Sequence, residues 1–233
     1  MRILLKLSGE ALAGDKKTGF DDATIERVAG QVKRLVDDGT QVGVVIGGGN
    51  FWRGRQNETV DRVKADQIGM LATVMNAIYV SEIFRGAGMM TNVLTPFECG
   101  SFTKLYSKDR ANKYFSKNMV VFFAGGTGHP YFSTDTGAVL RAVEIEADMI
   151  LLAKSIDGVY DSDPAKNPNA KRFDTISIDE VIARGLQVVD LTASIMVREN
   201  HMPLRIFALQ EEESIIRAAG GEFNGTTVTC GES

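Results

Sequence analysis

Residues 42–50 read Val42-Gly43-Val44-Val45-Ile46-Gly47-Gly48-Gly49-Asn50, an apolar run that ends in three consecutive glycines. A short apolar run bounded by turn-forming residues is typical of a strand that is buried on both faces. The same pattern occurs where Ile3–Leu7 is followed by Ser8-Gly9, and where Met119–Ala124 is followed by Gly125-Gly126-Thr127-Gly128. The three runs therefore predict buried strands that end in glycine turns.

Helical patterns separate these strands, as in a parallel sheet covered by helices. Apolar residues recur at helical spacing over 25–36 and over 68–79, with Asp21 or Asp22 as the expected first cap and Gly86 near the second end. Further expected elements are a helix at 136–147, strands at Asp148–Ala153, Leu204–Leu209 and Thr226–Cys230, and a short helix between the last two strands. We predict a single, continuous α/β domain over residues 1–233.

Composition and charge exclude several classes of protein. The chain has 233 residues, of which 44% are hydrophobic and 24% charged, and its net charge is −4, so neither a nucleic-acid binder nor a disordered tail is expected. Two cysteines and two histidines are too few for a disulfide scaffold or a multi-histidine metal site. No run of 18 apolar residues occurs, and Lys6 interrupts the apolar start, so neither a membrane span nor a signal peptide is expected. A cytoplasmic, reduced protein is the expectation.

The three glycine turns define where a ligand would bind. In an open parallel sheet, ligands bind outside the carboxyl ends of the strands, so the turns should form one crevice. Glycine allows close approach of the backbone, whose N–H groups can face an anion. Neither G-x-x-x-x-G-K-[ST] nor G-x-G-x-x-G is present, which excludes a Walker-A site and disfavours an NAD-dependent oxidoreductase.

Three charged residues near these turns are candidates for the site. Lys6 lies within an apolar strand, so it either faces the surface or binds phosphate oxygens at the strand end. Arg53 follows the triple glycine, with Arg55 and Arg62 nearby, and is either a phosphate ligand or a solvated charge. Asp66 starts the long helix, where a first-turn carboxylate is also favoured by the helix dipole.

The segment after the third glycine turn places a helix start over the same crevice. Thr134 or Asp135 could cap this helix, or its free N–H groups could bind an anion. His129 is read as a turn residue. The segment 155–172 is rich in turn-forming residues and predicts a long loop, in which Tyr160 either packs locally or stacks on a planar base.

Several blocks together resemble the bacterial uridylate (UMP) kinases of the amino-acid kinase superfamily. They are Lys6–Leu12, Val44–Asn50, Gly69–Asn76, Glu144–Asp148 and Asp157–Tyr160. The resemblance runs from Met1 to about residue 225. It implies a three-layer α/β/α sandwich with a mainly parallel central sheet, and transfer of the γ-phosphoryl group of ATP to UMP with Mg²⁺.

The resemblance also implies roles for individual residues. Those at the reacting phosphates are Lys6, Asp135 and Arg53. Those expected to bind ATP are Lys6, Leu7, Ser8, Gly9, Gly49, Arg53, Lys154, Tyr160 and Asp163. Those expected to bind UMP are Gly48, Asp66, Thr127, Gly128, His129, Pro130, Tyr131, Phe132, Ser133 and Thr134. No protein metal site is implied, because the nucleotide phosphates mainly hold Mg²⁺.

Assembly and regulation are further expectations from the resemblance. The family is typically hexameric, and the apolar helix 68–84 is a candidate interface. Inhibition by UTP is a possible regulation, whereas the stretch Gly14–Asp21 departs from the family pattern and leaves GTP activation doubtful. Near Lys154, relatives often carry Thr or Asn. The alternatives are a carboxylate or carbamate kinase of the same superfamily, and a non-catalytic nucleotide sensor.

Overall fold

One mainly parallel sheet organises the structure, a computed structural model that describes residues 1–53, 59–186 and 188–231. Its strand order is β4-β3-β5-β2-β1-β6-β10-β11-β9, and the strands from β4 to β10 run parallel, while β11 is antiparallel to β10. The strands are β1 (Arg2–Leu7), β2 (Gln41–Ile46), β3 (Thr91–Thr95), β4 (Lys104–Leu105), β5 (Val120–Phe123), β6 (Met149–Lys154), β7 (Val159–Tyr160), β8 (Arg172–Phe173), β9 (Thr175–Ser177), β10 (Leu204–Ala208) and β11 (Gly225–Thr229). Arg55 lies outside the described residues.

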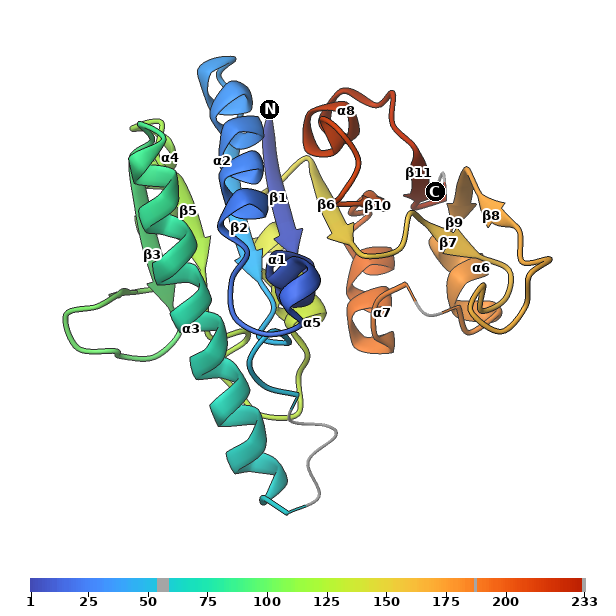
Figure 1. The fold of residues 1–233 in the computed structure, drawn as a ribbon, viewed down its shortest axis with the longest axis horizontal. Coiled ribbons are helices and arrows are strands. Elements are labelled where there is room, and N and C mark those ends of the chain that lie inside the picture. The colour runs from blue at the N-terminus through green and yellow to red at the C-terminus, as the bar shows by residue number, and fades with distance from the viewer. Residues whose placement is uncertain (54–58, 187, 232–233) are drawn as a thin grey trace.

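Helices cover both faces of this sheet (Figure 1). They are α1 (Gly9–Ala13), α2 (Asp22–Asp37), α3 (Arg62–Gly86), α4 (Lys108–Phe115), α5 (Thr134–Glu144), α6 (Ile178–Ala183), α7 (Leu191–Glu199) and α8 (Ser214–Gly220), with a 3-10 turn η1 (Gly14–Lys16) after α1. One hydrophobic cluster joins α1, α2, α3 and α8 to the sheet, and a second joins α4, α5, α6 and α7 to it. The three-layer α/β/α sandwich is therefore confirmed.

The strongly periodic segments fold as the sequence predicts. Asp21 caps α2 by accepting a hydrogen bond from the Thr24 backbone N–H at 3.1 Å. The helix expected at 136–147 instead spans Thr134–Glu144, because Ser133 caps it. The sequence patterns missed β3, β4, β9, α1, α4, α6 and α7, which are short or mixed in polarity.

The segment 155–172 is not a structureless loop. Val159 pairs with Phe173 and Tyr160 with Arg172, so β7 and β8 form a separate antiparallel hairpin. The turn-forming residues lie mostly in the connection between these two strands. The pairing of the strands fixes the two ends of this connection next to each other.

Helix α3 is long and apolar enough by length and composition to cross a membrane. Of its most apolar stretch of 18 residues, 44% is buried, and the helix packs against β3, β2, β5 and α2. Figure 1 shows that its N-terminal half extends beyond the sheet on the side where β1, β2 and β6 end. The helix therefore flanks the edge where the predicted crevice lies.

Candidate active site

The three glycine turns meet at one edge, because β5, β2 and β1 are consecutive in the sheet. The turns after β1 and β2 touch: a Cβ atom added to Gly9 would lie 2.4 Å from the carbonyl oxygen of Gly47. The turn after β5 contains Gly125, Gly126 and Gly128, all with positive φ. Only glycine adopts such a backbone without strain. The three glycine turns therefore lie together at the carboxyl edge of the sheet, as predicted.

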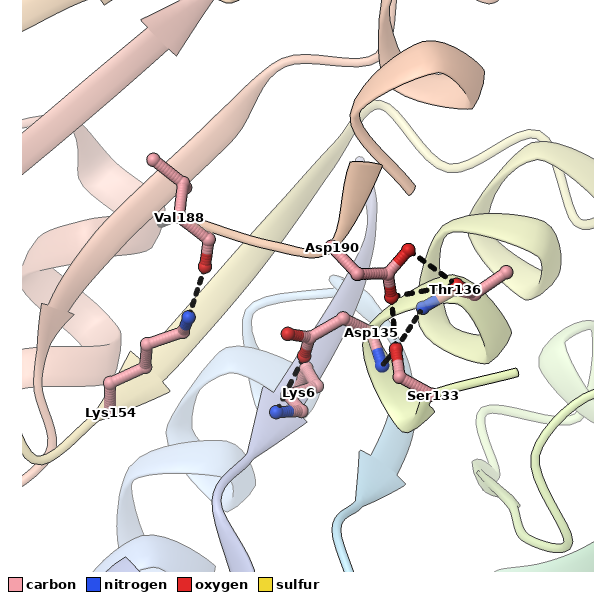
Figure 2. A network of polar contacts seen from close by, with 7 residues as sticks. All are labelled: Lys6, Ser133, Asp135, Thr136, Lys154, Val188 and Asp190. Carbon is pink, nitrogen blue, oxygen red and sulfur yellow. Dashed lines mark hydrogen bonds and ion pairs between the residues drawn. The ribbon is translucent and has the colours of Figure 1, made fainter. Parts of the chain in front are cut away.

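A buried ion pair lies in this crevice (Figure 2). The Lys6 Nζ is 2.7 Å from the Asp135 Oδ1, and the two side chains are only 9% and 20% exposed. Lys6 comes from β1, whose residues from Ile3 to Leu7 are all buried, so it does not face the surface. Asp135 comes from the first turn of α5. The structure thus brings together two residues that are 129 positions apart in the sequence. Because the pair is buried, removal of either partner destabilises the fold.

Ser133, rather than Thr134 or Asp135, caps helix α5. Its Oγ accepts hydrogen bonds from the backbone N–H groups of Asp135 and Thr136, each at 3.1 Å. With serine as the cap, the Asp135 side chain turns toward Lys6, as Figure 2 shows. The expectation that Thr134 or Asp135 is the cap is wrong, because Thr134 already lies in the helix.

Asp190 links α5 to α7 by hydrogen bonds. The sequence patterns did not predict this role. Its carboxylate accepts hydrogen bonds from the hydroxyls of Ser133 and Thr136 (Figure 2). It also accepts one from the backbone N–H of Ala193 at 3.0 Å. It is also the N-cap of α7. An aspartate directly before a helical pattern is a cap signal that could have identified it, but its contact with Ser133 depends on tertiary structure.

Lys154 is the second lysine of the crevice and ends β6. Its Nζ donates a hydrogen bond to the carbonyl of Val188 (Figure 2). Burial lowers the pKa of this ammonium from its ordinary value, and the charge of Lys6 lowers it further, while Asp135 acts in the opposite direction. Lys154 lines both a central cavity of about 650 Å³, which also contains Asp135 and Asp190, and the neighbouring cavity at the β7–β8 hairpin. It therefore lies where the two cavities adjoin.

A smaller cavity of about 200 Å³ lies between the glycine turns and α3. Its wall contains the predicted residues Gly48, Gly49, Asp66, Thr127, His129, Phe132, Ser133 and Thr134. Among the described residues, Gly128, Pro130 and Tyr131 belong to the same loop but not to this wall. The cavity shares Ser133 with the central one.

Asp66 holds the loop over this smaller cavity. Its Oδ2 accepts the Tyr131 backbone N–H at 2.8 Å and faces the Arg62 Nε at 2.9 Å, and its side chain is 14% exposed. Tyr131 has a φ of +73°, a conformation that non-glycine residues rarely adopt. Asp66 lies in the second turn of α3, since the helix begins at Arg62, so the first-turn interpretation is wrong.

The cavity at the β7–β8 hairpin has a volume of about 460 Å³, and its lining brings together Lys154, Tyr160 and Asp163. The Tyr160 hydroxyl donates to Asp157 Oδ1 at 2.7 Å, and this hydrogen bond raises the pKa of the phenol. Asp157 is also paired with Arg172 at 2.6 Å. Tyr160 therefore packs locally while it faces a cavity, so the two interpretations of this residue are compatible.

Arg53 lies outside the three cavities of the site. Its guanidinium pairs with Glu10 Oε1 at 2.8 Å, and both side chains are about half exposed. Within the described chain, Arg53 does not line any of the three cavities, whereas Gly49 lines the smallest. Glu10 reaches this turn closely, since a Cβ atom on Gly49 would lie 2.7 Å from its carboxylate oxygen. Leu7, Ser8 and Gly9 form the adjoining backbone, where the Ser8 N–H donates to Ala153.

No cluster of three or more His, Cys, Asp or Glu side chains that could hold a metal ion occurs among the residues that the structure describes. Asp190 is already occupied by the hydroxyls of Ser133 and Thr136, and Asp135 by Lys6. This donor set fits a cation whose ligands come mainly from another source, such as phosphate oxygens.

Fold and site together define an open-sheet α/β protein with a buried lysine–aspartate pair, whose aspartate lines the central of three adjoining cavities. The model of the amino acid kinase family matches residues 1–208, so the chain belongs to this family.

Individual relatives agree with this assignment. The chain is 46% identical to a uridylate kinase of Rickettsia bellii (strain RML369-C) over 229 residues, which are 97% of this chain and 96% of the relative. The crystal structure of a UMP kinase from Bacillus anthracis superimposes with a TM-score of 0.94 at 34% identity, covering 99% of this chain and 96% of the other. A UMP kinase from Ureaplasma parvum gives 0.93 at 34% identity and 98% coverage of both chains.

Proposed function

We propose that the protein transfers the γ-phosphoryl group of ATP to UMP and so forms UDP and ADP. The observation that carries this proposal is the position of the Lys6–Asp135 pair beside the central cavity, which adjoins a cavity on each side. The smaller cavity shares Ser133 with the centre, and the hairpin cavity shares Lys154 with it. Two ligands bound in the outer cavities would therefore meet at the central cavity, beside Asp135 and its partner Lys6. The names of the relatives supply UMP as the acceptor.

The two outer cavities are assigned to the two nucleotides. ATP would place its base in the hairpin cavity near Tyr160 and Asp163, and its phosphates near the segment Lys6–Gly9, Gly49 and Arg53. UMP would occupy the smaller cavity, with its ribose hydroxyls at Asp66 and its phosphate at Gly48 and the loop 127–134. Asp66 is suited to accept hydroxyl donors, because its carboxylate belongs to a residue in the wall of this cavity.

In phosphoryl transfer the protein mainly positions the two substrates and neutralises their negative charge. Phosphoryl transfer depends on alignment of the two substrates and on stabilisation of negative charge. Lys6 would bind the transferring phosphoryl group, Asp135 would orient Lys6, and the N–H groups at the start of α5 would add positive potential. No general base is required, because a phosphate oxygen of UMP is already an anionic nucleophile. Mg²⁺, when bound through the nucleotide phosphates, would offset their mutual repulsion.

A homohexamer is part of the same proposal. One face of α3 is apolar and exposed: Leu71, Met75 and Ile78 are 56%, 45% and 39% exposed, and Phe102 beside them is 78% exposed. With Phe20 and Tyr79 they line an apolar hollow of about 630 Å³. A second copy of the chain would cover this face, and the resulting dimers would form the hexamer. We further propose a cytoplasmic location, with UTP as an inhibitor.

The proposed function is tested by measuring release of ADP from Mg·ATP with single acceptors: UMP, CMP, dUMP, N-acetylglutamate, aspartate and carbamate. Turnover that depends on UMP is expected. Turnover with a carboxylate or carbamate in place of UMP would refute the assigned acceptor site. No turnover with any acceptor, from folded protein that binds ATP, would favour a nucleotide sensor.

A further inference from the structure

Two buried asparagines join the glycine turn after β2 to helix α3. Asn50 is 2% exposed and Asn76 is fully buried. The Asn76 Nδ2 donates to the Gly47 carbonyl and to the Asn50 Oδ1, each at 2.7 Å. The Asn50 Nδ2 donates to the Gly19 carbonyl at 2.9 Å and to the Asn76 Oδ1 at 3.1 Å. Each amide group thus uses both of its N–H donors, so the buried pair is a fully satisfied polar network.

This amide pair lies where the two phosphate-side turns touch. A Cβ atom on Gly9 would come within 2.7 Å of the Asn50 Oδ1 as well as 2.4 Å of the Gly47 oxygen. The Gly47 N–H in turn donates to Leu7 at 3.0 Å. A displacement of Asn50 would therefore move the β2 turn relative to the β1 turn.

Helix α3 also forms a side-chain hydrogen bond with the glycine turn after β5. Thr73, which lies one helical turn before Asn76, accepts the Gly125 N–H on its Oγ1 at 2.8 Å. The same hydroxyl donates to the Met70 carbonyl at 2.7 Å, which fixes its orientation. Because residues three apart share a helix face, one rigid face of α3 contacts both the β2 and the β5 turns.

We propose that the Asn50–Asn76 pair is a positioning element of the transfer site: from within α3 it sets the place of Gly48 and Gly49 relative to the β1 turn and Lys6. The inference rests on the proposed function, in which Gly48 contacts the acceptor and Gly49 the donor. A shift of about 1 Å in such a turn can cost about 10²-fold in rate, although no atom of the pair touches a substrate. The pair therefore acts on kcat more than on binding of either nucleotide.

The matched control is Ser81→Ala. Ser81 is a buried polar residue of the same helix, 3% exposed, and its hydroxyl bonds to Thr91 at 2.8 Å, away from the glycine turns. Asn76→Ala, Asn50→Ala, the double variant and Ser81→Ala are compared by thermal unfolding and by steady-state kinetics with UMP and ATP varied separately. Turnover is expressed per folded molecule.

We expect Asn76→Ala to lower kcat at least about tenfold more than Ser81→Ala, with a smaller change in each KM. The double variant should be no slower than the slower single variant, because the pair acts as one unit. Equal loss of kcat in Asn76→Ala and Ser81→Ala would overturn the proposal, as would multiplicative effects in the double variant. If Asn76→Ala does not fold, Asn50→Ala, which alters a loop residue, takes its place. The same tenfold difference in kcat from Ser81→Ala then tests the proposal. Absence of turnover in the wild-type protein would instead refute the proposed function.

Discussion

Replacement of Lys6 by methionine separates a structural role of the buried ion pair from a catalytic one. Methionine keeps most of the apolar stem of lysine and removes its charge. The Asp135 carboxylate would then stay 20% exposed without its cation. Removal of one partner from a buried pair costs about 3–5 kcal/mol, and partial exposure of Asp135 places the expected loss near about 3 kcal/mol. For a chain of this length the melting temperature should fall by roughly 6–12 °C.

The same substitution should lower turnover by at least about 10²-fold, the scale of one lost charge-stabilising donor. The double variant Lys6→Met/Asp135→Asn tests the cause. A neutral amide in place of the carboxylate should restore much of the lost stability, because no carboxylate is then left without the charge of Lys6. Turnover should stay low in both variants.

The measurements are thermal unfolding and a coupled assay of ADP release with UMP as acceptor. Turnover of Lys6→Met within tenfold of wild type would refute the assignment of Lys6 to the reacting phosphates. An unchanged melting temperature would refute the structural part of the reasoning. Recovery of turnover in the double variant would show that lost folding, not lost chemistry, explains the single one.

Four further predictions follow from the same geometry. Gly9→Ala should lower kcat/KM for ATP at least about tenfold, because its Cβ would lie 2.4 Å from the Gly47 oxygen and must push the two turns apart; an unchanged kcat/KM would contradict this. Asp66→Asn should raise the KM for UMP and leave that for ATP unchanged, whereas equal effects on both would exclude a role specific to the acceptor. Asp190→Asn should lower the free energy of unfolding by about 1–3 kcal/mol, as measured in urea, because Ser133, Thr136 and the Ala193 N–H lose a charged acceptor; no loss would disprove the proposed link between α5 and α7. Burial lowers the pKa of Lys154, so between that value and 10.5 the unfolded chain binds more protons and stability rises with pH; Lys154→Met should remove this rise, and an unchanged pH profile would contradict the assigned burial.

The sequence predicted the parts of the site that local patterns determine. The strands β1, β2 and β5 are continuous apolar runs followed by glycines, and the rule that parallel strands end at one edge placed their turns together. Lys6 and Asp135 were each identified, one by its place in an apolar strand and one by its place at a helix start. Their contact joins residues 129 positions apart, so local spacing could not reveal it.

Other features depend on packing between distant segments. Asp190 reaches Ser133 and Thr136 only because α7 packs against α5. The sequence did not predict the β7–β8 hairpin, because each of its strands has two residues, too few for an alternating pattern. Arg53 was expected at the phosphates, and its pairing with Glu10 at the rim could not be inferred from its distance to the glycines along the chain.

Phosphorus NMR of the wild-type protein with Mg·ATP and UMP tests the central proposal most directly, because it follows the transferred group itself. The proposed reaction predicts that ATP and UMP signals decline together while ADP and UDP appear in equal amounts, with no inorganic phosphate. Release of inorganic phosphate with UMP unchanged would contradict it, since the protein would then hydrolyse ATP rather than transfer its phosphoryl group.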